Sequence, residues 1–150
     1  MKKILIIFLL ILASCGYQPI YKTNENFKNI NINEVIYLGD QKINDEIYSN
    51  LPFVLVKNDE NLNKLSIESK KEIEITSKNA KGQAVSYRTT INVKILILNN
   101  NEDIIDQKAV EKSFFYNSDE NKFKFKGYQK KIEENLIKEI INDIIIHLNY

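Results

Sequence analysis

Cys15 is the only cysteine of this 150-residue chain, and its position gives it the most specific chemistry in the sequence. It ends the run Leu12-Ala13-Ser14-Cys15 and cannot form a disulfide within the chain. A thiol is a nucleophile once it loses its proton. The small side chains of Ala13 and Ser14 leave room for an enzyme to reach the thiol and the peptide bond before it. We therefore expect Cys15 to be covalently modified.

The residues before Cys15 have the pattern of a secretory signal. Lys2 and Lys3 form a basic start, and residues 4–12 are apolar without a charge. A helix of that length extends about 14 Å, too short to cross a hydrocarbon core of roughly 30 Å. The three features together resemble the bacterial lipobox. The resemblance implies a removed signal peptide (residues 1–14), a diacylglycerol and a palmitoyl group on Cys15, and a lipidated tether (residues 15–26). The alternative is a signal anchor in which Cys15 is only a small apolar residue.

The residue after the cysteine bears on the destination of such a lipoprotein. An aspartate there tends to retain bacterial lipoproteins in the inner membrane, and this chain has Gly16. The lipobox resemblance therefore implies a lipid anchor in the outer membrane, with the domain facing the periplasm. Two or more long acyl chains make such an attachment effectively permanent. We expect one domain in residues 27–150, which is long enough to bury a core.

The composition argues against several classes of function. Lys and Arg number 21 against 20 Asp and Glu, a net charge of +1, whereas nucleic-acid-binding domains are normally strongly basic. The sequence lacks a glycine-rich phosphate loop, a His/Cys cluster and a hydrolase nucleophile motif. His147 is the only histidine, which excludes a metal site with two histidines, and we expect it to be a partly exposed surface residue. We expect no enzymatic activity, no cofactor, no metal and no nucleic-acid partner.

The first half of the domain predicts a strand and a short helix. Apolar residues alternate with asparagines in residues 27–38, which is typical of a strand. Asp40 is a good N-cap, and Ile43, Ile47 and Leu51 recur at helical spacing until Pro52 ends the pattern. The apolar residues 53–56 are compatible with a strand or with a buried connection, and residues 58–64 with a loop.

The middle of the chain predicts an antiparallel meander of three strands. In residues 65–76 the apolar residues Leu65, Ile67, Ile73 and Ile75 occupy odd positions, which indicates a half-buried strand. Residues 84–98 alternate in the same way, and residues 104–116 form a further strand whose irregular phase is typical of a bulge. Polar loops at residues 77–83 and 99–103 connect the three strands.

The last element is a long helix, expected to begin near Phe125 or Gly127 after a loop at residues 117–122. Its apolar residues recur every fourth position at Ile132, Leu136 and Ile140, which is the pattern of a helix that covers a sheet. The predicted fold is therefore α+β, a two-layer sandwich of order β-α-β-β-β-α. About four mostly antiparallel strands carry two helices on one face.

The residues after the lipobox resemble a known family. Cys15-Gly16-Tyr17-Gln18-Pro19-Ile20-Tyr21, the order of elements and the strand ending Phe115-Tyr116-Asn117 are similar to the LPS-assembly lipoprotein LptE family. The resemblance implies a lipoprotein without enzymatic activity that plugs the outer-membrane β-barrel LptD. The two proteins of that family form the lipopolysaccharide translocon, and the plug also binds lipopolysaccharide.

Three basic residues are candidate contacts for the phosphates of lipopolysaccharide. Arg88 is the single arginine, on the expected polar face of its strand, and Lys78 and Lys81 belong to the adjacent loop. A guanidinium can hold a phosphate with two hydrogen bonds. The alternative for Arg88 is a cross-strand ion pair with Glu72 or Glu74. The alternative for the whole protein is a stand-alone lipoprotein that binds a small or lipidic ligand in an enclosed apolar pocket between sheet and helices.

Overall fold

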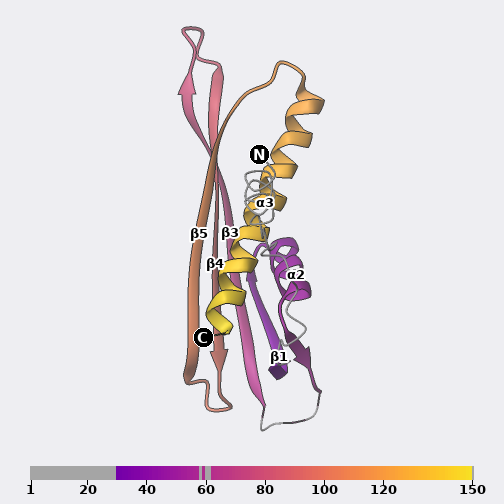
Figure 1. The fold of residues 1–150 in the computed structure, drawn as a ribbon. Helices are drawn as coiled ribbons and strands as arrows, with labels where there is room; N and C mark the ends of the chain where they lie inside the picture. Colours follow the sequence, from indigo (N-terminus) through magenta and orange to yellow (C-terminus); the bar gives the residue numbers. More distant parts are fainter. Residues whose placement is uncertain (1–29, 58, 60–61, 150) are drawn as a thin grey trace, which may run out of the picture.

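The computed structural model describes residues 30–57, 59 and 62–149. The expected signal peptide, Cys15, the tether and the first residues of the expected first strand (27–29) lie outside the described residues. Seven elements follow in the order β1 (Ile30–Gly39), α2 (Gln41–Asn50), β2 (Phe53–Leu55), β3 (Asn63–Lys78), β4 (Ala84–Leu98), β5 (Ile104–Asn117) and α3 (Lys122–Leu148) (Figure 1).

The strands form one sheet in the order β2-β1-β3-β4-β5. The meander is confirmed, because β3, β4 and β5 pair antiparallel along nearly their whole length. The sheet has five strands where about four were expected, since Phe53–Leu55 pairs with β1 as a short edge strand. β1 pairs in parallel with both β2 and β3, so parallel pairing has a larger share than the sequence pattern predicted. The α+β class and the element order are confirmed.

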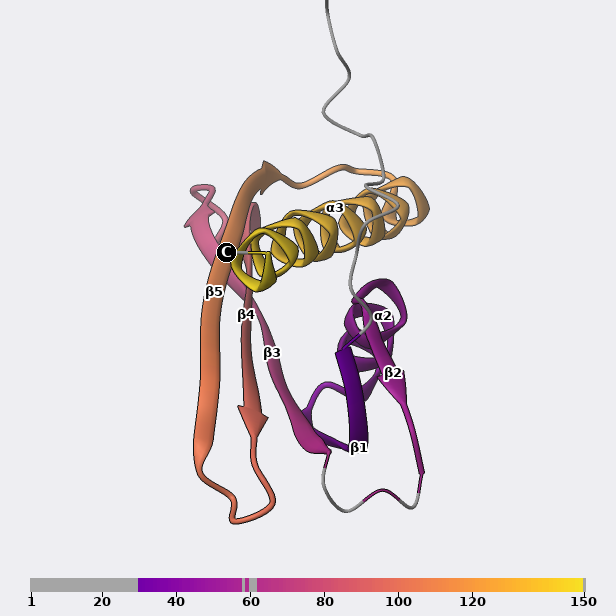
Figure 2. The ribbon, with the colours of Figure 1, turned by 60° about the horizontal axis from the view of Figure 1, so that its bottom comes forward.

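The core lies between the sheet and the two helices, which cover the same face (Figure 2). The isoleucine stripe of α3 supplies the largest share of the helical side of this core. Complete burial of one such side chain stabilises a fold by about 1.5–3 kcal/mol. Neither helix is long and apolar enough to cross a membrane. The large hydrophobic side chains with almost no exposed surface are Ile32, Ile43, Ile47, Leu65, Ile67, Ile91, Ile95, Ile137, Ile140 and Ile144.

Side-chain caps fix the start of each helix. The carboxylate of Asp40 accepts a hydrogen bond from the backbone N–H of Ile43 at 3.2 Å, which confirms the predicted N-cap. In α3 the side chain of Asn121 accepts from the N–H groups of Phe123 and Lys124. The helix therefore begins at Lys122, earlier than the expected Phe125 or Gly127. The first turn, Lys122-Phe123-Lys124-Phe125, places its apolar residues at every second position, so the helical periodicity did not reveal this start.

β1 ends where its backbone comes close to that of β3. Gly39 has φ +81°, and a Cβ at this position would lie 1.9 Å from the carbonyl oxygen of Ser69. Only glycine fits both the backbone angle and this approach. The next N–H, that of Asp40, donates to the same Ser69 oxygen at 3.0 Å. The chain then enters α2, while β3 continues to Lys78.

An ion-pair cluster joins both helices to the sheet near this point. Glu133 of α3 accepts from Lys42 of α2 at 2.9 Å and from Lys71 of β3 at 2.8 Å. Burial acts to raise the pKa of Glu133, but the hydrogen bonds from Lys71 and Lys42 outweigh it and lower the pKa below its ordinary value. Glu133 is therefore ionised at neutral pH and holds the three elements together.

Candidate functional site

The candidate site is the upper end of the β3–β4 hairpin, which extends beyond the helices (Figure 1). Its tip loop, residues 79–83, is organised by Asn79. The side-chain oxygen of Asn79 accepts from the N–H groups of Lys81 and Gln83, both at 3.0 Å. Gly82 provides the positive φ of +77° that the turn needs. The loop therefore holds its shape by itself, and the candidate residues Lys78 and Lys81 are both exposed at the end of the hairpin.

Arg88 lies on the face of the sheet that points away from the helices, as predicted. Its guanidinium forms an ion pair with Glu74 through Nη2 and a second hydrogen bond through Nε at 3.2 Å. The cross-strand pair with Glu74 is therefore present. The guanidinium also lies over the ring of Phe115, with 5.5 Å between its central carbon and the ring centroid. Arg88 thus joins β3, β4 and β5 in one row and keeps three of its five N–H donors for other partners.

The three candidate cations do not form a single cluster. Arg88 is paired in register with Glu74, and Lys78 lies four residues further along β3. At about 3.3 Å per residue, the two backbone positions are roughly 13 Å apart. This separation suits a ligand with more than one anionic group, or a charged surface, better than one small phosphate.

Hydrophobic side chains surround this end of the molecule, and their exposure was not predicted from the sequence. Ile73 and Ile75 were expected on a buried face, but they are 49% and 52% exposed. They do point to the helix side, since they pair in register with Thr89 and Tyr87. No helix covers them among the described residues, because the upper part of β3 extends past the helical layer. Phe115 is 61% exposed on the opposite face, and Phe123 at the start of α3 is 88% exposed.

An aromatic cluster supports the hairpin from below. Phe125 of α3 packs against Tyr87 and Tyr116, with ring centroids 5.2 and 5.9 Å apart. The buried hydroxyl of Tyr116 is hydrogen-bonded to Thr89 at 2.9 Å and accepts from Gln129 at 3.1 Å. These contacts fix the first turns of α3 to β4 and β5. The exposed groups above the cluster therefore stand on a rigid base.

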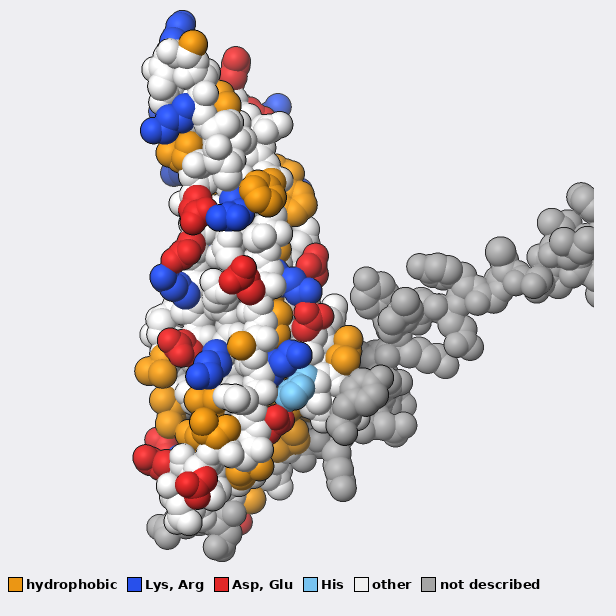
Figure 3. All heavy atoms as spheres, turned by 90° about the vertical axis from the view of Figure 1, so that its left-hand side faces the viewer, with side chains coloured by type: hydrophobic (Ala, Val, Ile, Leu, Met, Phe, Trp, Pro, Cys, Tyr) orange, Lys and Arg blue, Asp and Glu red, His pale blue; other side chains and the backbone are white. Residues whose placement is uncertain are grey.

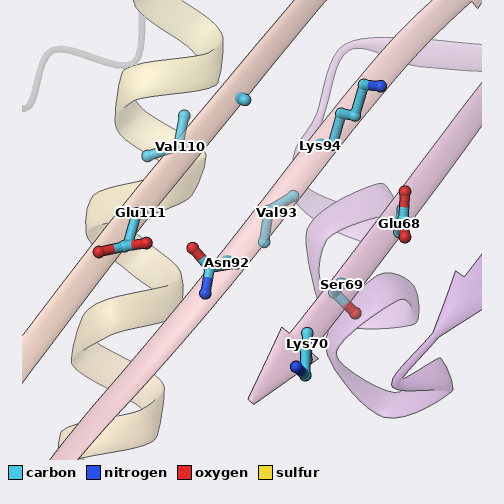
Figure 4. A pocket seen from close by; sticks show the side chains of 9 residues that line it. Glu68, Ser69, Lys70, Asn92, Val93, Lys94, Val110 and Glu111 are labelled. Atoms are coloured by element: carbon cyan, nitrogen blue, oxygen red, sulfur yellow. The ribbon is translucent and has the colours of Figure 1, made fainter. Parts of the chain in front are cut away.

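The open face of the sheet carries a shallow hollow of about 450 Å³ (Figure 4). Charged and polar side chains from three strands line it, among them Glu68, Lys94, Asn92 and Glu111. The hollow lies on the outer face, not between sheet and helices, and it is open to solvent. It differs in both respects from the enclosed apolar pocket that a small-ligand carrier needs. Acidic and basic side chains are interspersed over this side of the molecule, and hydrophobic side chains gather toward its lower end (Figure 3).

Comparisons with known proteins bear on the fold. No known family profile matches the sequence, and no curated protein matches it. Rare lipoprotein B from Shewanella oneidensis is similar in structure, with a TM-score of 0.59 at 10% identity, over 78% of this chain and 94% of that one. The chain therefore shares the fold of this bacterial lipoprotein.

Two further structures share the fold. A minor lipoprotein from Acinetobacter baumannii has a TM-score of 0.57 at 13% identity, over 78% of this chain and 88% of that one. A homolog of a neuraminyllactose-binding hemagglutinin from Helicobacter pylori has a TM-score of 0.54 at 13% identity, over 88% of this chain and 89% of that one. At such identities the likeness shows the fold alone, and function must be argued from the surfaces.

Proposed function

We propose that the protein is an outer-membrane lipoprotein, acylated on Cys15, that plugs a β-barrel of the LptD type and with it inserts lipopolysaccharide at the cell surface. The observation that carries this proposal is the hairpin end, where cationic and hydrophobic side chains lie together on a rigid base. Lipid A has phosphates and acyl chains, and such a surface offers partners for both. The lipoprotein fold and the lipobox resemblance support the proposed membrane anchor.

The open face of the sheet supports the plug role. It carries interspersed acidic and basic side chains (Figure 3), and the lumen of a large outer-membrane barrel is also polar. A surface with interspersed acidic and basic side chains can lie against the polar wall of a wet lumen. In this proposal the three basic residues Lys78, Lys81 and Arg88 contact lipopolysaccharide directly.

The test is affinity purification of the full chain from membranes in mild detergent. We expect a large outer-membrane barrel to co-purify in a fixed ratio. Depletion of the protein should leave lipopolysaccharide in the periplasm. The matched control is Cys15→Ala, which keeps the folded domain and removes the acylation site. Recovery of the lipidated protein only as a free monomer would contradict the proposal and favour the stand-alone lipoprotein.

A further inference from the structure

The first turns of α3 carry a concentrated positive charge. Between Asn121 and Ile132 the helix has five lysines and no acidic residue, and all five lysines are exposed. Of the five, only Lys130 has an acidic partner among the described residues, Glu134 at 3.7 Å. Ammonium groups oppose the helix dipole in a first turn, so helix formation does not account for these charges. The five are Lys122, Lys124, Lys126, Lys130 and Lys131.

An exposed aromatic ring lies in the middle of these lysines. The side chain of Phe123 is 88% exposed. Residues three, seven and eight positions further along a helix lie on the same side, and here all three are lysines. Gly127, four positions on, adds no side chain beside the ring, although a Cβ there would meet no atom within 4 Å. The glycine weakens the helix and leaves the ring uncovered. We call Phe123 with Lys126, Lys130 and Lys131 the basic face of α3.

The basic face points away from the sheet. Phe125, two positions after Phe123 and therefore on the other side of the helix, packs against Tyr87 and Tyr116. α3 lies over one face of the sheet and turns its outer side to solvent (Figure 2). A surface on the outside of a helix is convex, so it does not enclose a small molecule as a ligand pocket does.

A convex cationic surface with one exposed ring suits the surface of an anionic phospholipid bilayer. The headgroups supply an extended layer of phosphates. Lysine binds them as a point charge and does not need the fixed geometry with which arginine holds a single phosphate. Aromatic rings settle at the level of the headgroups. Each lysine close to such a surface raises the binding constant by about fivefold.

The proposed lipid anchor brings such a bilayer within reach of the basic face. Residues 16–29 separate Cys15 from β1, and a chain of that length spans at most about 50 Å. β1 begins at the opposite end of the molecule from the start of α3 (Figure 1). The 27 residues of α3 extend about 40 Å. The chain before β1 is therefore long enough for the anchor and the basic face to share one bilayer.

We infer that the basic face of α3 docks on the anionic phospholipid bilayer that holds the lipid anchor, in the state in which no barrel encloses the domain. Phe123 enters the interface, and Lys126 and Lys131 contact headgroup phosphates. The inference rests on the proposed function for the anchor alone. The docked state leaves the tip loop and the open face of the sheet free for the contacts proposed above.

The test uses tryptophan fluorescence, because the chain has no tryptophan of its own. Phe123→Trp is made in the full chain, which is purified from membranes in detergent and reconstituted into phosphatidylcholine vesicles with or without phosphatidylglycerol. We expect a blue shift and quenching by brominated acyl chains only with phosphatidylglycerol. Both should be lost at about 1 M salt, because the charges are then screened. The control Phe115→Trp, at a side chain 61% exposed on the open face of the sheet, should give the same emission in both vesicles.

Charge reversal separates the contribution of the lysines from that of the ring. Lys126→Glu with Lys131→Glu, in the Phe123→Trp chain, should lower the ratio of docked to free α3 by at least about tenfold. The matched control is Lys57→Glu with Lys94→Glu, which makes the same change of net charge at two exposed lysines outside α3. The control should change the ratio by less than about twofold. Equal losses in the two double variants would overturn the inference.

Flotation of the vesicles tests the anchor separately from the docking. A chain that floats with the vesicles but shows no fluorescence change at Phe123→Trp would overturn the inference and leave the plug proposal standing. A chain that does not float would contradict the anchor and overturn the inference with it. A third set of vesicles contains lipopolysaccharide in place of phosphatidylglycerol at equal phosphate. An equal response to these vesicles would overturn the assignment to phospholipid, and we expect a weaker one.

Discussion

The two hairpin loops at opposite ends of β4 share one hydrogen-bond pattern and carry opposite charges. In the tip loop Asn79 accepts from the N–H groups two and four residues later, and its amide donates to Gln83. In the base loop, residues 99–103, Asn99 makes the same three bonds with Asn101 and Asp103. The tip loop carries Lys81, whereas the base loop carries Glu102 and Asp103. One asparagine thus fixes the shape and leaves the other positions free to set the charge.

Charge exchange should give the largest difference between the two loops, measured as lipopolysaccharide binding. Replacing both tip lysines (Lys78→Glu with Lys81→Glu) should weaken lipopolysaccharide binding by at least about tenfold, because two attractive contacts become repulsive. The control Glu102→Lys should leave binding within about twofold. Equilibrium titration of labelled lipopolysaccharide at fixed ionic strength measures both. Equal losses in the two loops would remove the tip from the proposed site.

Removal of the organising asparagine should affect both loops alike. Asn79→Ala and Asn99→Ala each remove three hydrogen bonds, and each should lower the free energy of unfolding by about 1–2 kcal/mol. Asn100→Ala, in the same base loop, should change it by less than about 0.5 kcal/mol. Urea unfolding of the full chain in detergent gives the three values. A clear difference between the unfolding free energies of Asn79→Ala and Asn99→Ala would contradict the expectation that the two asparagines stabilise their loops equally.

The smallest expected effect concerns the residue with positive φ. The tip loop has Gly82 there, at +77°, and the base loop has Glu102, at +66°. Glu102→Gly should raise the free energy of unfolding by about 0.5–1 kcal/mol, and Gly82→Ala should lower it by about the same amount. A Cβ at Gly82 would meet no atom within 4 Å, so backbone strain alone causes the loss. Thermal unfolding measures both changes. Opposite signs of the change in unfolding free energy would support one shared turn geometry, and equal signs would contradict it.

The sequence predicted which faces of the strands are apolar but not which of them are covered. In β4 the alternation reports burial correctly, since Ile91, Val93 and Ile95 are all in the core. The same alternation in β3 includes Ile73 and Ile75, which are half exposed. Periodicity records the direction of a side chain within one strand. Coverage depends on where a distant helix begins, and the Asn121 cap that sets this start has no periodic signal.

The candidate site was predictable only in part. The single arginine and the loop lysines could be selected from the sequence, and one of the acids expected to pair with Arg88, Glu74, does so. Phe115 was noted as part of the strand ending, but its contact with Arg88 depends on the register between β4 and β5. The parallel pairing of β1 with β3 joins residues far apart in the chain and leaves no local pattern.

That parallel pairing also has a consequence for the order of folding. The paired residues Val35 and Leu65 are 30 positions apart, whereas Lys78 and Ala84 across the tip loop are six apart. Closing a short loop costs less chain entropy and occurs sooner. We expect the meander to form first and β1, the strand nearest the proposed lipid anchor, to join last. Until it does, the edge of β3 is open along its full length, and Lys64, Lys70, Lys71 and Lys78 protect it from pairing with other unfolded chains.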